Sequence, residues 1–129
     1  MGESELTWRA VQLEDELLDF NRLLGVVTQW SVAYAVCYVH SDAARSGLLL
    51  KVGSDDEAKI YLNGKPVYTW DTPRYWFSDQ DVVAGVELRA GLNVLVLKVV
   101  NGLGDWQASV RFTDAAGQPL KGIQVQRVP

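Results

Sequence analysis

The chain has 129 residues, enough for one domain with its own core, and its 48% hydrophobic and 22% charged residues are typical of a folded globular protein. The net charge is -4 and the basic residues are scattered, which argues against a nucleic-acid partner because phosphate binding needs clustered positive charge. No run of about 18 apolar residues is present, so we expect no membrane span and a single domain over residues 1–129.

The N-terminal part predicts one strand and one helix. Residues 7–13 alternate between apolar and polar as a strand does. From residue 14 the apolar spacing becomes helical, acidic residues occupy the first turn, where the helix dipole favours them, and Gly25 is a plausible stop. We therefore expect one short helix over Glu16–Leu24 that covers an open end of the domain.

The rest of the chain predicts short strands. Residues 31–40 and 92–101 are apolar on both faces, which predicts central strands covered on both sides. Further strands are expected at residues 48–52, 58–62, 65–70, 81–89, 106–112 and 123–128. Gly, Asn and Asp separate them, and this pattern predicts an all-β fold, an antiparallel β-sandwich of the jelly-roll kind.

The segment 53–67 is the most distinctive motif. Asn63-Gly64 predicts a two-residue hairpin turn, because both central positions of that turn need positive φ. Asp55 and Asp56 precede the hairpin at a glycine-led turn, where acidic side chains commonly accept backbone N–H groups. We expect such capping; the alternative is a structural calcium site, which would need further groups to reach about 6–8 oxygen ligands.

Candidates for catalysis are few. The single histidine, His40, ends a predicted central strand, and Cys37 lies in an apolar run, which favours a small buried side chain over a nucleophile. No nucleophile motif or metal-binding Cys/His spacing accompanies them. The acids near turns could form a glycoside-hydrolysing pair, but turn capping explains them. We expect no enzyme.

Residues 70–81 contain four aromatic residues, an arginine, three acids and a glutamine. Aromatic rings and planar polar groups are what proteins use to hold the C–H faces and hydroxyls of sugars. Pro73 stiffens the segment, which we expect to be a loop. The predicted carbohydrate contacts are Trp70, Asp71, Arg74, Tyr75, Trp76 and Gln80. The alternative is that some of these rings fold back over the end of the sandwich.

Three other tryptophans are assigned by pattern. Trp106 shares a strand face with apolar residues, so we expect it in the core. Trp8 and Trp30 stand beside strand starts and are expected in the core or at its rim.

Several short motifs carry a resemblance to a known family. They are Ala33-Tyr34-Ala35, Gly53-Ser54-Asp55-Asp56, Asn63-Gly64-Lys65, Asp79-Gln80-Asp81, Gly91-Leu92-Asn93 and Asn101 followed by a glycine-rich turn and Trp106. Together they resemble the galactose-binding-like jelly-roll modules of bacterial polysaccharide-degrading proteins, and the hairpin is similar to that in the sugar-binding domain of family 2 glycoside hydrolases. A weaker likeness is to protective-antigen-type lectin domains, where an Asp pair holds calcium; here Glu57 stands where glycine usually follows the pair.

The resemblance implies a function. It predicts a non-catalytic carbohydrate-binding module that targets an appended glycoside hydrolase to a plant- or algal-type polysaccharide such as a β-glucan. It also implies a secreted or extracytoplasmic, monomeric module of a larger protein, whose signal sequence lies outside the printed chain. The alternative is a structural or protein-interaction domain in which the same aromatic and arginine residues contact a neighbouring catalytic domain.

Overall fold

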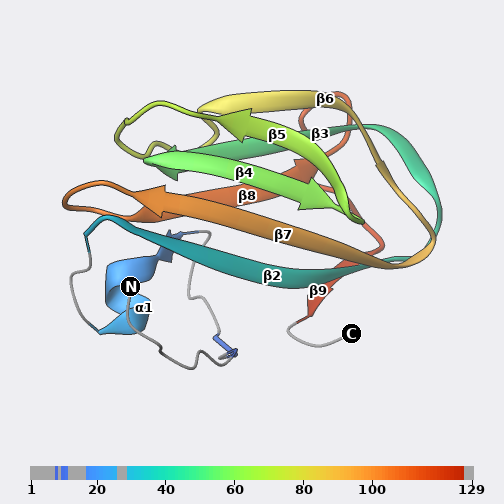
Figure 1. Cartoon of the computed structure of the whole chain (residues 1–129). Coiled ribbons are helices and arrows are strands. Elements are labelled where there is room, and N and C mark those ends of the chain that lie inside the picture. Colours follow the sequence, from blue (N-terminus) through green and yellow to red (C-terminus); the bar gives the residue numbers. More distant parts are fainter. Residues whose placement is uncertain (1–7, 9, 12–16, 26–28, 127–129) are drawn as a thin grey trace.

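Two antiparallel sheets face each other in the structure, a computed structural model that describes residues 8, 10–11, 17–25 and 29–126 (Figure 1). One sheet has the strand order β1-β8-β3-β6 and the other β5-β4-β7-β2-β9. The elements are β1 (Leu18–Asp19), α1 (Phe20–Leu24), β2 (Ser31–Ser41), β3 (Arg45–Asp55), β4 (Glu57–Leu62), β5 (Lys65–Trp70), β6 (Asp81–Leu88), β7 (Gly91–Asn101), β8 (Gln107–Thr113) and β9 (Ile123–Gln126). The predicted antiparallel sandwich with one short N-terminal helix is confirmed.

The helix is shorter than predicted. Of the expected span Glu16–Leu24, Leu18 and Asp19 instead form β1, which pairs with β8. Asp19 then caps α1, accepting a hydrogen bond from the Arg22 N–H at 3.1 Å, and Gly25 ends the helix at φ 77°. Residues 12–16 lie outside the described part of the chain, as does most of the strand predicted over 7–13, whose described residues 8, 10 and 11 belong to no strand.

The hairpin has the predicted geometry. Asn63 and Gly64 connect β4 to β5 with φ values of 51° and 81°, both positive as the two-residue turn requires. Asn63 also reaches the neighbouring strand: its amide donates to Asn93 Oδ1 at 2.9 Å, and its Oδ1 accepts the Val94 N–H at 2.9 Å. These bonds attach the hairpin to β7.

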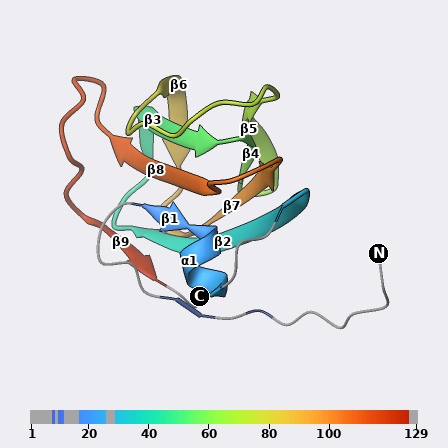
Figure 2. The ribbon, with the colours of Figure 1, turned by 90° about the vertical axis from the view of Figure 1, so that its left-hand side faces the viewer.

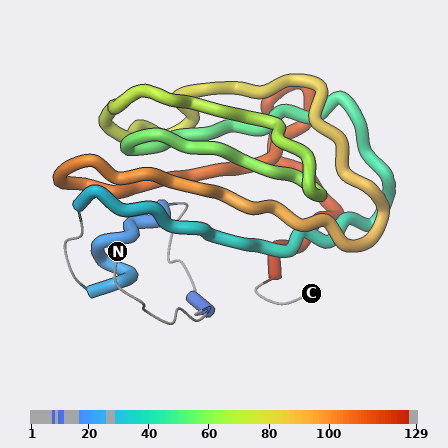
Figure 3. Tube along the Cα trace, viewed as in Figure 1, coloured from blue at the N-terminus to red at the C-terminus, as the bar shows by residue number. Residues whose placement is uncertain are grey.

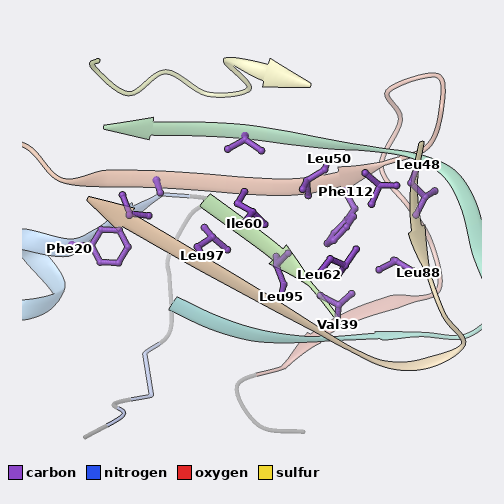
Figure 4. Close-up of a cluster of buried hydrophobic side chains, with 14 of the residues drawn as sticks. Phe20, Val39, Leu48, Leu50, Ile60, Leu62, Leu88, Leu95, Leu97 and Phe112 are labelled. Carbon is purple, nitrogen blue, oxygen red and sulfur yellow. The ribbon is translucent and has the colours of Figure 1, made fainter. Parts of the chain in front are cut away.

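The core lies between the two sheets and is built from alternate residues of the facing strands (Figure 4). Trp106 is 1% exposed, donates its indole N–H to the Val99 carbonyl at 3.1 Å, and packs on Phe20 with ring centroids 5.2 Å apart. Its predicted core position is confirmed. Phe20 brings α1 onto the same cluster, so the helix is anchored by one buried ring.

Strand β2 differs from prediction on one face. Both β2 and β7 are internal strands of the five-stranded sheet, but Val32 and Tyr34 on the outer face of β2 are 45% and 51% exposed. The prediction that β2 is covered on both faces is wrong. Val and Tyr are favoured in strands because they suit a pleated, half-buried surface, so an apolar outer face does not require a covering layer.

One end of the sandwich collects four connections, which we call the loop end. Ser31 at the start of β2 pairs with Asn101 at the end of β7, and Asp55 at the end of β3 pairs with Gln107 at the start of β8. The residue before β2, the β3–β4 turn, the β5–β6 loop and the β7–β8 loop therefore lie at the same end. Figure 2 looks onto this end. Within the described residues, no helix has the length and apolar character needed to cross a membrane.

Candidate functional site

Residues 74–77 of the β5–β6 loop point their side chains alternately inward and outward. The side chain of Arg74 is 14% exposed and Trp76 is half-buried, whereas Tyr75 is 79% and Phe77 68% exposed. Two inward residues thus hold a segment that presents two rings to solvent.

Arg74 closes the loop end between the two sheets. Its guanidinium donates to Asp81 Oδ2 at 2.7 Å, to the Ser54 carbonyl and hydroxyl at 3.2 and 3.1 Å, and to the Tyr68 hydroxyl at 3.1 Å. It also stacks over the Trp70 ring, 4.2 Å from the ring centroid. These contacts use most of its donors inside the protein.

The charges of this network are stable at neutral pH. Burial raises the pKa of Asp81, but hydrogen bonds from Tyr68 and Arg74 outweigh it and hold that pKa below its ordinary value. Burial and the hydrogen bond to Asp81 raise the pKa of Tyr68 above its ordinary value. The carboxylate therefore stays ionised while the phenol keeps its proton, and the ion pair with Arg74 persists.

Trp76 lies on the outer face of the four-stranded sheet. Its indole N–H donates to Ser109 Oγ at 2.9 Å. Below it is Gly53, where an added Cβ would come within 2.2 Å of the Phe77 carbonyl oxygen and 2.8 Å of Trp76 Nε1. The loop can approach this closely because position 53 has no side chain, which gives a packing reason for the glycine of the sequence motif.

The next residues fasten the loop further along. Gln80 accepts the Ser54 N–H at 2.8 Å and donates to the Tyr75 carbonyl at 2.6 Å, so it bridges the loop and β3. Asp79 forms an ion pair with Arg111 at 2.6 Å. The backbone on both sides of the Tyr75 ring is thereby fixed.

Asp56 joins the β5–β6 loop to the β7–β8 loop. Its Oδ1 accepts the Arg74 N–H at 3.2 Å, and its Oδ2 accepts the Gly102 N–H at 2.9 Å. Asp55 is 4% exposed, and its pKa is raised to about 7 by burial, by a hydrogen bond with Asp56, and by the charges of Asp56 and Asp105. Asp56 thus has the predicted capping role, extended over two loops.

This arrangement does not fit calcium. Both oxygens of Asp56 accept backbone donors, and the described residues contain no group of three or more His, Cys, Asp or Glu side chains that could hold a metal ion. Calcium wants about 6–8 oxygen ligands, more than the Asp55–Asp56 pair presents.

Trp30 is a residue of the loop end that sequence reasoning missed. It is 77% exposed, whereas we expected it in the core or at its rim, and its backbone has φ 50°, which is uncommon for a bulky residue. The Trp30 N–H donates to the Gly102 carbonyl at 2.9 Å, and its ring lies beside Gly102. No sequence signal predicts a positive φ at a tryptophan, and such strain is typical of functional positions. Trp8 is also exposed, at 74%.

Comparison with known proteins adds evidence on the fold. No protein-family model and no curated protein matches the chain. A solved structure of a family 35 carbohydrate-binding module from an environmental isolate matches 81% of this chain and 78% of its own, with a TM-score of 0.54 and 20% sequence identity. The sandwich has the fold of a carbohydrate-binding module. At this identity the likeness concerns the fold, and the assignment of a site rests on the residues themselves.

Of the six predicted contact residues, two have solvent-exposed positions. Tyr75 and Asp71 are exposed. The other four are at least partly buried, and their contacts with the protein hold the loop in place: Trp70, Arg74, Trp76 and Gln80. The six residues are therefore together at the loop end but have different structural positions, and whether they bind sugar stays a prediction.

The reactive side chains singled out in the sequence lie elsewhere. His40 is near the far end of β2, and Cys37 packs against the core. Burial raises the pKa of the Cys37 thiol to about 11, so it is protonated at neutral pH and a poor nucleophile.

Proposed function

We propose that this chain is a non-catalytic carbohydrate-binding module that holds a neutral glycan on Tyr75, Phe77 and Trp30 at the loop end. The observation that carries the proposal is that Tyr75 and Phe77 are exposed on a loop whose residues Arg74, Trp76 and Gln80 are held by hydrogen bonds. A rigid loop loses little conformational entropy when a ligand binds, so ring stacking contributes to affinity with a small ordering cost.

The chemistry of the site sets the class of ligand. Exposed rings stack on the C–H faces of pyranoses, and the carboxylate of the exposed Asp71 can accept hydrogen bonds from sugar hydroxyls. We place the target among neutral plant- or algal-type polysaccharides such as β-glucans. The module would act in a secreted or extracytoplasmic protein, as the monomeric targeting domain of an appended glycoside hydrolase.

The first prediction concerns these rings. A stacked ring contributes on the order of 1 kcal/mol beyond area burial, so Tyr75→Ala and Phe77→Ala should each weaken glycan binding about fivefold and together more strongly. Affinity electrophoresis against soluble β-glucan, xylan, mannan and galactan measures this, with isothermal titration on the best ligand. Affinity should change little with salt, since no ion pair with the ligand is involved.

Val125→Ala is the matched control, because Val125 is 65% exposed on β9, away from the loop end. If the double ring variant binds as the native chain does, the site is misplaced. If the native chain binds none of the glycans but binds a catalytic domain of its parent protein, the interaction-domain alternative is correct.

A further inference from the structure

The outer face of the five-stranded sheet carries an unusual row of residues. Strand pairing sets Tyr34 of β2 opposite Lys98 of β7, Lys98 opposite Lys59 of β4, and Lys59 opposite Thr69 of β5. Tyr61 is on the same face, two residues after Lys59. The row crosses four strands, and Figures 1 and 3 show no other described element in front of it.

The two lysines oppose each other directly. Directly paired residues of antiparallel strands have Cβ atoms about 4.5–5.5 Å apart, and like charges at such positions destabilise a sheet. Within the described residues, neither Lys59 nor Lys98 has an acidic partner, because the ion pairs there involve Arg45, Arg74 and Arg111. Glu57 is on the same face, two residues before Lys59, but forms no ion pair with either lysine in the described structure. The described part of the fold therefore places two lysines side by side with no acidic partner for either.

Aromatic rings flank this charge pair. Tyr34 is 51% exposed next to Lys98, and the Lys59 ammonium lies 5.3 Å from the centroid of the Tyr61 ring. Neighbouring strands are about 4.7–4.9 Å apart, so the row from Tyr34 to Thr69 suits an extended ligand that crosses the strands. Rings and cations in one row match a chain of sugars that bears negative groups.

We propose that this row, Tyr34-Lys98-Lys59 with Tyr61, is a second glycan site that binds the carboxylate or sulfate groups of an acidic polysaccharide. The lysines contact the anionic groups, and the tyrosines contact the sugar rings. An acidic protein fits less well, because lysine is depleted from protein interfaces and here it stands in the middle of the row. The row shares no residue with the loop end, so either site can be tested without the other.

The test compares glycans by charge. The native chain is titrated with a soluble oligogalacturonate, a sulfated galactan and a neutral galactan; the first two distinguish carboxylate from sulfate as the bound group. The Lys59→Gln/Lys98→Gln double variant should lose about tenfold in affinity for the acidic ligand that the native chain binds. Raising salt from about 10 mM to about 1 M, where the Debye length falls from about 30 Å to about 3 Å, should abolish that binding.

The controls separate this site from general charge and from the loop end. Lys121→Gln removes an exposed lysine outside the row and should leave acidic-glycan binding unchanged. Tyr34→Ala should weaken oligogalacturonate or sulfated-galactan binding several-fold but not the binding of poly-glutamate. The double lysine variant should bind neutral β-glucan as the native chain does, and should melt at the same or a higher temperature because a repulsion is removed. Three results would each overturn the proposal. The native chain could fail to bind the acidic glycans at low salt, or the double lysine variant could bind them with native affinity. The third result is that Tyr34→Ala loses poly-glutamate binding as much as it loses acidic-glycan binding.

Discussion

Asp55 and Asp56 are neighbours in the sequence but have different surroundings. Asp56 accepts two backbone N–H groups from separate loops. Asp55 is buried beside it, and ionising Asp55 would place a second negative charge next to the first, with Asp105 nearby. The pair therefore favours one proton and one charge at mildly acidic pH.

This gives a prediction for the pH dependence of stability. The pKa of Asp55 is about 7 in the folded chain and near 3.8 when unfolded, so between these values the folded state binds more protons than the unfolded state. Raising the pH through this window must then lower the free energy of unfolding. Melting temperatures measured from pH 4 to 8 should fall more steeply in the native chain than in Asp55→Asn. Asp71→Asn, at an exposed position of the same end, should follow the native curve. Parallel curves for the native chain and Asp55→Asn would contradict the assignment.

Single residues were predictable from the sequence where local rules decide their position. The turn role of Asp56, the positive φ values at Asn63 and Gly64, and the buried Trp106 all follow from short-range patterns. Trp30 was not predictable, because its φ and its exposure depend on a hydrogen bond to Gly102, far along the chain.

At the scale of elements, the β5–β6 loop was expected as a binding loop, and its fold-back on the sheets was only an alternative. Both descriptions hold for different residues, because over residues 74–77 every second side chain turns inward. The inward partners are on β3, β6 and β8, and no periodicity within the loop could identify them. The length of the helix was overestimated for a similar reason. Leu18 and Asp19 have helical spacing in the sequence, but in the structure they form β1 and pair with β8.

A further prediction concerns Arg74, the anchor of the β5–β6 loop. Arg74→Gln should lower the free energy of unfolding by about 2–3 kcal/mol, because it leaves the partly buried Asp81 without its cationic partner. The same substitution should also weaken neutral-glycan binding, although Arg74 does not contact the ligand, because the backbone that carries the Tyr75 ring is no longer held in place. Urea unfolding and glycan titration measure the two effects. Trp76→Phe, which keeps a ring but loses the bond to Ser109, should show a smaller loss of both. An Arg74→Gln variant with native stability and affinity would show that the network does not position the loop.

At the scale of the molecule, the residues that stabilise the fold and the residues that we propose to bind glycans lie in different parts of the sandwich. The core between the sheets is continuous from Phe20 to Phe112 (Figure 4). The exposed rings are at the loop end, and the two opposed lysines are on the outer face of the five-stranded sheet. Alternation along each strand permits this division, because successive side chains point to opposite faces. Substitutions on the exposed surfaces should therefore change binding without changing the fold.

Two tryptophans test that division. Trp106→Ala should lower the free energy of unfolding by about 3–5 kcal/mol, because it empties a fully buried site and removes the ring that packs on Phe20. Trp30→Ala should change stability by less than about 1 kcal/mol, since its ring is 77% exposed, but should weaken binding of the neutral glycan. Thermal melts and glycan titrations of both variants provide the comparison, and Trp106→Phe, which retains most of the packing, should recover much of the lost stability. If Trp106→Ala kept its native stability, the structural role of Trp106 would be wrong. If Trp30→Ala unfolded while Trp106→Ala did not, the two roles would be reversed.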